Sequence, residues 1–262
     1  MEHESIYNKI QELFGMIPEN YNILEEEIDI NLQMEYFDFS KKVKRNMTDD
    51  DKVEERYFLF EEDTIVDKKK EILVKLASLE DVQAYRAIEQ YLEEPDNGLR
   101  QWAVLALQES RMLLQSNLLD ENQVFISTGL GGKGNKLRYF IVLLTKDEMV
   151  FDETRKKVVN NEFGAILTAQ DIEIEEVHFF NHFCTISTVI PMDVAIKQVF
   201  KNAINECNHF GDFLRDHFIV TNVKKLSESD IESFIREHAE ELDNPGFDDE
   251  DLDELPGMDA DD

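Results

Sequence analysis

The sequence predicts an α+β protein, helical in its N-terminal half and mixed α and β after about residue 120. Before that point apolar residues recur at steps of three and four, which is the period of an amphipathic helix. After it, short β-branched segments alternate with helical ones, as in a sheet that is covered by helices. The last segment, 239–262, holds 12 acidic and no basic residues. It has too few apolar side chains to offset the entropy of ordering, which predicts a disordered tail.

Length and charge exclude several classes of protein. The chain has 262 residues, of which 42% are hydrophobic, enough for one large or two ordinary domains. Its 58 acidic and 27 basic residues give a net charge of −31. Binding to a phosphate backbone depends on clustered Lys and Arg, so this balance predicts no nucleic acid partner. The absence of an apolar span, of a secretory signal and of a disulfide framework predicts a cytoplasmic protein with no membrane partner.

The N-terminal half shows helical periodicity throughout most of its length. Pro18 ends the first apolar stripe, because proline cannot continue a helix. Asp81 is placed to cap a helix, and Pro95–Gly98 is a strong turn signal. The stretch 52–66 fits either a helix end or a short extended piece. The predicted helices cover 6–17, 21–28, 32–43, 72–79, 82–92 and 99–114.

In the C-terminal half, segments with the helical period of three to four residues alternate with segments typical of strands. The segment LRYFIVLLT at 137–145 is apolar on both faces, which is typical of a central strand. Ser227 and Asp230 have the spacing of a capping box at the start of the last helix. The predicted strands are 123–128, 137–145, 172–180, 182–190 and 217–223, and the predicted helices are 148–163, 191–207 and the one that begins at Ser227.

One stretch resembles a known helical repeat. In the segment 96–107, DNGLRQWAVLAL, residues Asp96, Arg100, Ala103 and Leu107 match the turn and second-helix opening of a HEAT repeat. The resemblance covers one unit, about 71–116. It implies a HEAT-like, helical-repeat-like bundle, in which the Asp and Arg tie neighbouring turns together.

The order of elements over 137–223 is strand, helix, strand, strand, helix, strand. This order resembles the ferredoxin-like βαββαβ fold, a split βαβ arrangement with two helices on one face of a four-stranded sheet. We therefore predict four parts in the chain. They are a helical HEAT-like domain at 1–120, a β segment with a glycine-rich hinge at 121–136, a ferredoxin-like domain with a C-terminal helix at 137–242, and a disordered acidic tail at 243–262.

A glycine-rich loop precedes the central strand. Its backbone N–H groups and cations could hold an anion. A phosphate-binding P-loop, however, leads into a helix, whereas this loop leads into a strand. A flexible turn, either a hairpin tip or an interdomain hinge, is therefore the alternative to an anion site. The candidate anion-binding residues are Gly131, Gly132, Lys133, Gly134, Lys136 and Arg138, within the loop Gly129–Arg138.

The sequence holds no recognisable catalytic or metal-binding pattern. It has no G-x-S-x-G and no H-E-x-x-H, and its calcium-loop candidate at Asp49 lacks the required ligands. A metal site needs at least three converging donors, and the spacing of the His and Cys residues provides none. We predict no metal and no cofactor, and the lack of a catalytic pattern favours a protein without enzymatic activity over an enzyme. The residues weighed for a metal site are His178, His182, His209, His217, His238, Cys184 and Cys207.

Two sets of apolar residues are candidates for docking a protein partner. In the tail, Phe247, Leu252 and Leu255 alternate with carboxylates, which fits a short docking segment or a plain solubilising tail. In the helical half, Trp102 and the cluster 36–39 are anchor candidates, with core packing as the alternative.

These observations predict a non-enzymatic protein-interaction or scaffold module. The negative charge favours a basic protein partner through electrostatic steering. Unpaired edge strands would also allow a homodimer. The alternative is a sensor or enzyme that binds a small anionic ligand at the loop Gly129–Arg138.

Overall fold

The structure is a computed structural model, and it describes residues 21–47, 53–119, 124–146 and 149–238. It confirms the α+β class. The chain divides into two compact units, Pro18–Gly134 and Asn135–Asp262, with Met1–Ile17 assigned to the second. We call the described parts the helical unit and the sheet unit. The predicted first helix at 6–17 and the predicted disordered tail at 243–262 lie outside the described residues.

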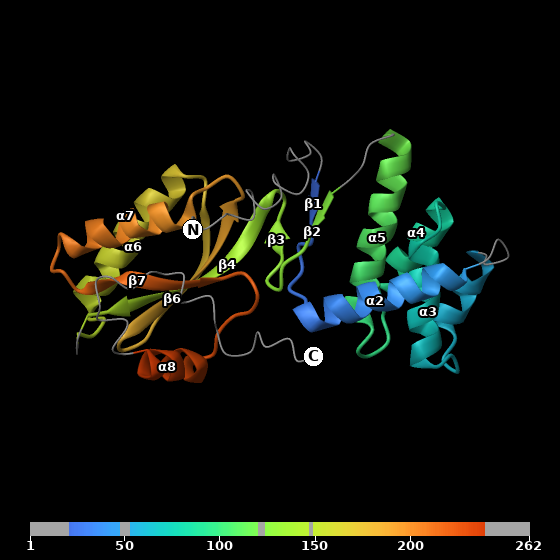
Figure 1. The fold of residues 1–262 in the computed structure, drawn as a ribbon, viewed down its shortest axis with the longest axis horizontal. Coiled ribbons are helices and arrows are strands. Elements are labelled where there is room, and N and C mark those ends of the chain that lie inside the picture. Colours follow the sequence, from blue (N-terminus) through green and yellow to red (C-terminus); the bar gives the residue numbers. More distant parts are fainter. Residues whose placement is uncertain (1–20, 48–52, 120–123, 147–148, 239–262) are drawn as a thin grey trace. The chain divides into compact units, whose positions relative to one another are not determined.

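The helical unit consists of helices with one small sheet. Its helices form where the sequence shows a period of three to four residues, and Asp81 caps α4 by accepting a hydrogen bond from the Gln83 N–H group. The ambiguous stretch at 52–66 contains a 3₁₀-helix. The elements are β1 (Tyr21–Ile23), α2 (Ile30–Asn46), η1 (Val53–Phe60), α3 (Val66–Ala77), α4 (Val82–Tyr91), α5 (Arg100–Leu119) and β2 (Val124–Ile126) (Figure 1).

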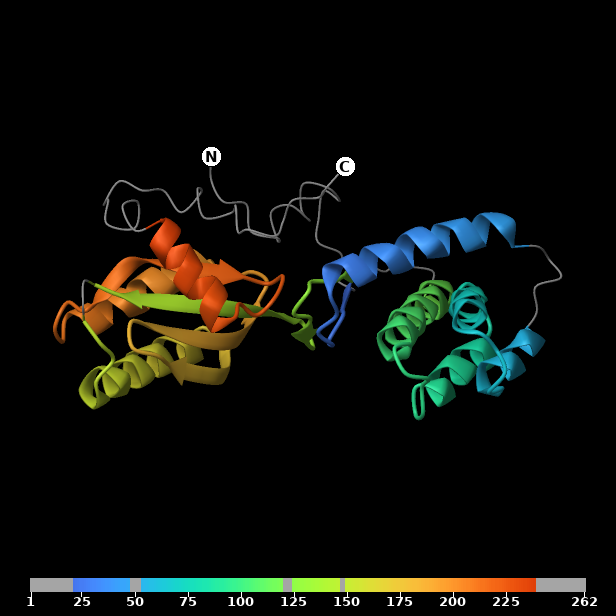
Figure 2. The same ribbon diagram turned by 90° about the horizontal axis from the view of Figure 1, so that it is seen from below.

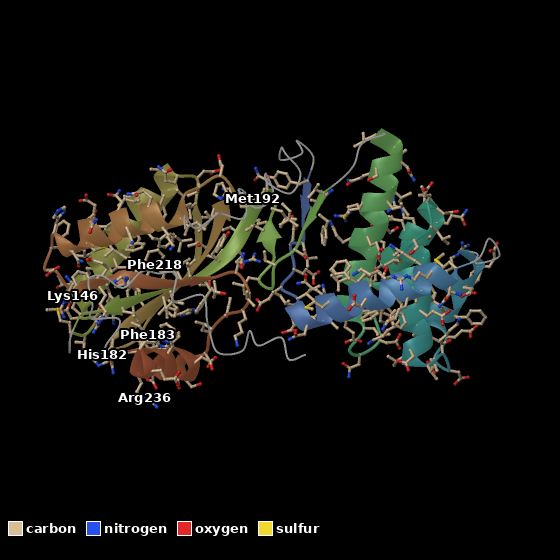
Figure 3. All side chains as sticks on the ribbon, in the orientation of Figure 1. Lys146, His182, Phe183, Met192, Phe218 and Arg236 are labelled. Atoms are coloured by element: carbon tan, nitrogen blue, oxygen red, sulfur yellow. The ribbon has the colours of Figure 1, made fainter. Side chains whose placement is uncertain are left out.

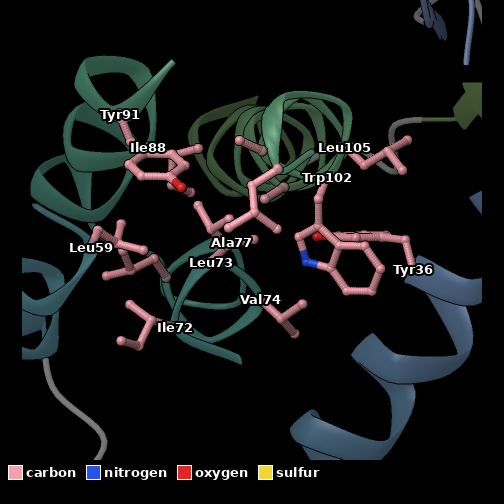
Figure 4. Close-up of a cluster of buried hydrophobic side chains, with 14 of the residues drawn as sticks. Tyr36, Leu59, Ile72, Leu73, Val74, Ala77, Ile88, Tyr91, Trp102 and Leu105 are labelled. Carbon is pink, nitrogen blue, oxygen red and sulfur yellow. The ribbon is translucent and has the colours of Figure 1, made fainter. Parts of the chain in front are cut away.

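The core of the helical unit lies where these helices meet (Figure 4). Trp102 on α5 is buried and makes edge-to-face contacts with Tyr36 and Phe39 of α2 at centroid distances of 5.1 and 5.5 Å. Leu73 of α3 and Ile88 of α4 are fully buried in the same cluster. Burial of such side chains contributes about 1.5–3 kcal/mol each, so this cluster is the main source of stability of the unit.

The predicted helix at 21–28 is wrong. Tyr21–Ile23 is a strand, and it pairs in parallel with Val124–Ile126 at the other end of the unit. Two further backbone hydrogen bonds extend the contact, from the Leu24 N–H group to the Ile126 carbonyl and from the Ile28 N–H group to the Gly129 carbonyl. Residues that are far away in the sequence supply the hydrogen-bond partners of the backbone here. This pairing overrides the weak local preference for a helix.

The sheet unit alternates strands and helices. Its elements are β4 (Lys136–Thr145), α6 (Glu153–Ala169), β5 (Glu173–Phe179), β6 (Phe183–Pro191), α7 (Ile196–Asn208), β7 (Leu214–Thr221) and α8 (Glu228–Glu237). A two-residue strand, β3 (Gly132–Lys133), lies at the end of the helical unit.

The strands run in the spatial order β5, β6, β4, β7, and neighbours are antiparallel. The prediction that 137–145 is a central strand is confirmed, because β4 pairs with β6 on one side and β7 on the other. Ile141 and Leu143 face the core formed with α6 and α7, which also holds Phe218 of β7 (Figure 3). Helix α8 lies across the face of the sheet opposite to α6 (Figure 2).

Caps fix the ends of the helices in the sheet unit. Helix α6 begins at Glu153 rather than near 148, because Asp152 accepts hydrogen bonds from the N–H groups of Thr154 and Arg155. The predicted capping box of α8 is confirmed, since Ser227 and Asp230 each accept a hydrogen bond from the backbone of the other. Within the described residues, no helix is long and apolar enough to cross a membrane.

Candidate functional site

The helical unit carries a groove between η1 and α4, which we call the η1–α4 groove. Residues at i and i+3 of a 3₁₀-helix lie on one side, so Tyr57 and Phe60 project from the same side of η1. Leu59 points the other way and is buried in the core, which anchors η1. The groove has a volume of about 380 Å³ and is lined by Arg56, Tyr57, Phe60, Val82, Gln83, Arg86, Ala87 and Gln90.

The aromatic rings of this groove are open to solvent. Tyr57 is 60% exposed and Phe60 is 46% exposed, although both are large side chains with apolar rings. The opposite wall is a stripe on α4 in which Gln83, Arg86 and Gln90 recur at helical spacing. The groove therefore combines two accessible ring surfaces with two guanidinium groups and two carboxamides.

The two arginines differ in their partners. The Arg56 guanidinium lies 4.9 Å from the centroid of the Tyr57 ring, and its Nη1 atom donates a hydrogen bond of 3.0 Å to Gln83 Oε1. Arg86 forms an ion pair with Glu89 one turn along α4, and this hydrogen bond raises the pKa of Arg86 above its ordinary value. Both guanidinium groups border the groove, and Arg56 lies against a ring without an ion pair to a carboxylate among the described residues.

A second cavity, of about 820 Å³, continues from the groove and shares Phe60 and Gln90 with it. Its lining is acidic, with the carboxylates of Glu62, Glu93 and Glu94. Taken together, the two cavities therefore have two chemically different ends. One end is lined by arginines and carboxamides, and the other is lined by carboxylates.

A buried lysine lies at the carboxylate end. Lys69 of α3 is 3% exposed, and its Nζ atom lies 2.6 Å from Asp96 Oδ2. The hydroxyl of Tyr91 donates to the same oxygen at 2.5 Å. The hydrogen bond from Lys69, followed by that from Tyr91, lowers the pKa of Asp96, and burial raises the pKa of Tyr91. These groups satisfy one another, so we assign them a structural role.

The glycine-rich loop contacts the chain's own groups. Gly131 lies against the backbone of Glu25 and Glu26, with a φ of +68°. The N–H group of Gly132 donates to the Glu25 carbonyl, and that of Gly134 donates to Glu25 Oε1 at 3.1 Å. Gly134 and Asn135 form the turn between β3 and β4. A carboxylate of the helical unit is therefore bound by this loop.

The cations beside this loop also have carboxylate partners. The Nζ atom of Lys136 lies 3.0 Å from Asp171 Oδ1 and 3.2 Å from Glu173 Oε1, and these contacts raise the pKa of Lys136. Arg138 binds both carboxylate oxygens of Glu175, at 2.6 and 2.9 Å. Lys133 is exposed at the hairpin.

Of the other candidate residues, Trp102 and the two cysteines lie in cores, His178 and His209 are exposed, and the tail residues lie outside the described chain. Trp102 is buried, and Lys70 lies 4.2 Å from its ring centroid. Cys184 and Cys207 are free thiols buried in the core of the sheet unit. No group of three His, Cys, Asp or Glu side chains in the described residues could hold a metal ion. The tail candidates Phe247, Leu252 and Leu255 are not among the described residues.

The residues of the η1–α4 groove were not predicted from the sequence. The missed signal is the three-residue step from Tyr57 to Phe60, which puts both rings on one side of a helix. In a strand the same two residues would point to opposite faces. The stretch was ambiguous between those forms, so the shared side could not be recognised.

Comparison with known proteins identifies no family. No protein-family model matches the chain, and no curated protein matches it. Among solved structures, the chain is similar to a "putative transposase" from Deinococcus radiodurans R1, with 16% identity and a TM-score of 0.34 over 40% of this chain and 93% of that one. It is also similar to the REP-associated tyrosine transposase bound to a REP hairpin, with 10% identity and a TM-score of 0.30 over 42% of this chain and 66% of that one.

These neighbours correct two predictions. Both are named as transposases, and one of them is bound to a REP hairpin. The predicted non-enzymatic protein-interaction module, with a ligand sensor at Gly129–Arg138 as its alternative, is contradicted by this finding. The sequence also predicted a basic protein partner and no nucleic acid partner. The same finding contradicts that prediction. The TM-scores assign this chain to no fold family, so its function has to be argued from its own residues.

Proposed function

We propose that this chain binds single-stranded nucleic acid, with bases stacked in the η1–α4 groove. The observation that carries the proposal is the pair of exposed rings, Tyr57 and Phe60, one 3₁₀ turn apart beside Arg56 and Arg86. Exposed aromatic rings are the surfaces on which proteins stack unpaired bases, and arginines beside them add contacts to bases and phosphates.

The other groups of the groove support the same ligand. Gln83 and Gln90 offer carboxamides, which both donate to and accept from the edges of bases. The carboxylates of Glu62, Glu93 and Glu94 at the far end repel phosphate. A bound strand therefore leaves the groove at the arginine end rather than at the carboxylate end.

The negative charge of the chain determines the kind of binding that we expect. Residues 18–134 hold 26 acidic and 14 basic residues, so long-range attraction cannot bring a polyanion to this unit. At physiological ionic strength charges are screened beyond about 8 Å, which leaves the local contacts of the groove to decide. Stacking contributes about 1–3 kcal/mol per base, so affinity rests on the rings more than on the charges.

Fluorescence anisotropy with a labelled oligothymidylate tests the proposal. Tyr57→Ala and Phe60→Ala should each weaken binding by about tenfold, because about 1.4 kcal/mol of stacking corresponds to a factor of ten. Phe210→Ala is the matched control, since Phe210 is 65% exposed but lies on the sheet unit. A duplex of the same length should bind more weakly, because its bases are already stacked.

The proposal fails if the parent protein does not bind the single strand, or if Phe210→Ala weakens binding as much as Tyr57→Ala and Phe60→Ala do. Circular dichroism of each variant shows whether the fold is intact. Since Tyr57 and Phe60 are exposed, we expect folded variants.

We further propose that the sheet unit is a ferredoxin-like domain and that α4 and α5 form one HEAT-like unit. The order β4, α6, β5, β6, α7, β7 and the spatial order β5, β6, β4, β7 support the first assignment. For the second, Asp96 links α3 and α4 through Lys69 and Tyr91, and Ala103 is buried between helices. The free thiols of the two cysteines support a cytoplasmic location.

A further inference from the structure

The end of α2 carries more cations than any other five-residue segment of the chain. Four of the five residues at 41–45, KKVKR, are Lys or Arg, in a protein whose net charge is −31. Cations at the C-terminal end of a helix are favoured by the helix dipole, which explains some positive charge there. The helix dipole does not explain why some of these cations have an ion-pair partner and others do not.

Two of the four cations are used within the unit. Lys41 pairs with Asp38 at 3.3 Å, and Lys44 forms an ion pair with Glu109. The other two, Lys42 and Arg45, are exposed and have no ion-pair partner among the described residues. Because they are three residues apart on a helix, their side chains are neighbours on one face.

The lysines of α3 give a contrast within the same unit. Lys68 pairs with Glu55 and Glu71, Lys69 with Asp96, and Lys70 with Glu35, while Lys75 pairs with Glu55 and Glu71. Each cation of α3 is therefore neutralised by its own unit. Lys42 and Arg45 are the pair of neighbouring cations that has no ion-pair partner within the described part of the helical unit.

The η1–α4 groove lies close to this pair along the chain. Helix α2 ends at Asn46 and η1 begins at Val53. An extended chain covers at most about 3.3–3.6 Å per residue, so these two ends are no more than about 25 Å apart. Asp49, Asp50 and Asp51 occur between them in the sequence and lie outside the described residues. Arg45 precedes Asn46 by one α-helical residue and Tyr57 follows Val53 by four 3₁₀ residues, so the Cα atoms of Arg45 and Tyr57 are no more than about 35 Å apart. An oligonucleotide of about 12 nucleotides spans this distance, which is within the site sizes of known single-strand binders.

We infer that Lys42 and Arg45 bind phosphate groups of the strand whose bases stack in the η1–α4 groove. This inference rests on the proposed function and adds a second contact region to it. The groove binds bases and the α2 end binds backbone. Each phosphate contact made by a cation releases counterions, so Lys42 and Arg45 add to the salt dependence of binding.

A salt titration separates the two regions. For single strands, the slope of log K against log salt is about −0.7 per neutralised phosphate. Lys42→Ala/Arg45→Ala should therefore make the slope shallower by about 1.4 with an oligothymidylate of about 12 nucleotides. Tyr57→Ala should lower affinity without changing the slope. The charge-preserving variant Lys42→Arg/Arg45→Lys should keep the parent slope.

The matched control removes two exposed cations from the sheet unit, Lys157→Ala/Arg236→Ala, with the same change in net charge. If this control reduces the slope as much as Lys42→Ala/Arg45→Ala does, the effect is one of net charge and the inference is wrong. If the slope of Lys42→Ala/Arg45→Ala equals that of the parent while Tyr57→Ala weakens binding, the inference is wrong and the proposed function stands. If the parent does not bind the strand at all, both are wrong.

Discussion

At the scale of a residue, Gly131 shows how a glycine allows two chain segments to approach each other closely. A Cβ atom at this position would lie 2.5 Å from the Glu26 carbonyl oxygen and 2.6 Å from that of Glu25. The same residue has a φ of +68°, which side chains disfavour. The glycine-rich loop is therefore packed against the segment of Glu25 and Glu26, and the lack of a side chain at 131 makes that packing fit.

Gly134 supplies a matched control for a test of this role. It has a φ of +61°, but nothing lies within 4 Å of its Cβ position. The left-handed conformation should cost about 1–2 kcal/mol in either alanine variant. Gly131→Ala should lose about 1–3 kcal/mol more, because the overlap forces the backbone to move. Urea unfolding followed by Trp102 fluorescence measures both, and equal losses of stability would contradict the prediction.

At the scale of elements, the ion pair between the buried Lys69 and Asp96 connects three parts of the helical unit. Lys69 belongs to α3, Tyr91 ends α4, and Asp96 precedes α5. The side chains of Lys69 and Tyr91 both donate hydrogen bonds to the Asp96 carboxylate. Removal of the carboxylate leaves the buried Lys69 ammonium without its counter-charge, which is more costly than removal of the pair.

We predict that Asp96→Asn destabilises the helical unit by about 2–3 kcal/mol, below the range for a fully buried pair because Asp96 is partly exposed. Lys69→Met/Asp96→Asn should recover much of this loss, since no buried charge remains. Thermal or urea unfolding of the three proteins measures the difference. A double variant less stable than Asp96→Asn would contradict the argument. Glu153→Gln, at an exposed ion pair of α6, should change stability by less than about 1 kcal/mol.

The same pair has a defined pH dependence. The pKa of Asp96 in the folded protein lies below its ordinary value of 3.8, so the ionised form is favoured by folding. The stabilisation is complete above that ordinary value and is lost as the pH falls through the lower folded value. The difference in stability between the parent and Asp96→Asn should therefore be constant near neutral pH and should narrow below about pH 4. A difference that stays constant down to pH 2 would contradict the assignment.

At the scale of the whole molecule, each unit has its own apolar core and its own natural probe. Trp102, the one tryptophan of the sequence, is buried in the core of the helical unit. Cys184 and Cys207, the two cysteines, are buried in the core of the sheet unit. Burial raises the pKa of both thiols, that of Cys207 to about 12, so they react with thiol reagents only after the sheet unit opens.

These probes test whether the units unfold independently. Asp96→Asn should move the unfolding transition of Trp102 fluorescence and leave the rate of thiol labelling unchanged. Phe200→Ala, which removes a fully buried ring from the sheet unit, should cost about 3–5 kcal/mol and speed thiol labelling without moving the Trp102 transition. If either substitution shifts both probes together, the two cores unfold as one cooperative unit.

The sequence by itself determined the features that depend on neighbours within a turn or two. The helical period identified α2, α3, α4 and α5, and the run that is apolar on both faces identified β4 as a central strand. Asp81 and Ser227 could be predicted as caps, because a cap bonds to a residue two or three positions away. For all of these the physical cause is local, so the sequence pattern is enough.

The tertiary structure alone decided what depends on distant partners. Tyr21–Ile23 is a strand because Val124–Ile126 pairs with it, and no pattern within 21–28 contains that information. The candidate site was missed for a related reason. Tyr57 and Phe60 share a side because the buried Leu59 and the packing of α3 and α4 fix that stretch as a helix rather than an extended piece. Long-range pairing and packing select among local conformations of similar energy, and that selection is made only in the folded chain.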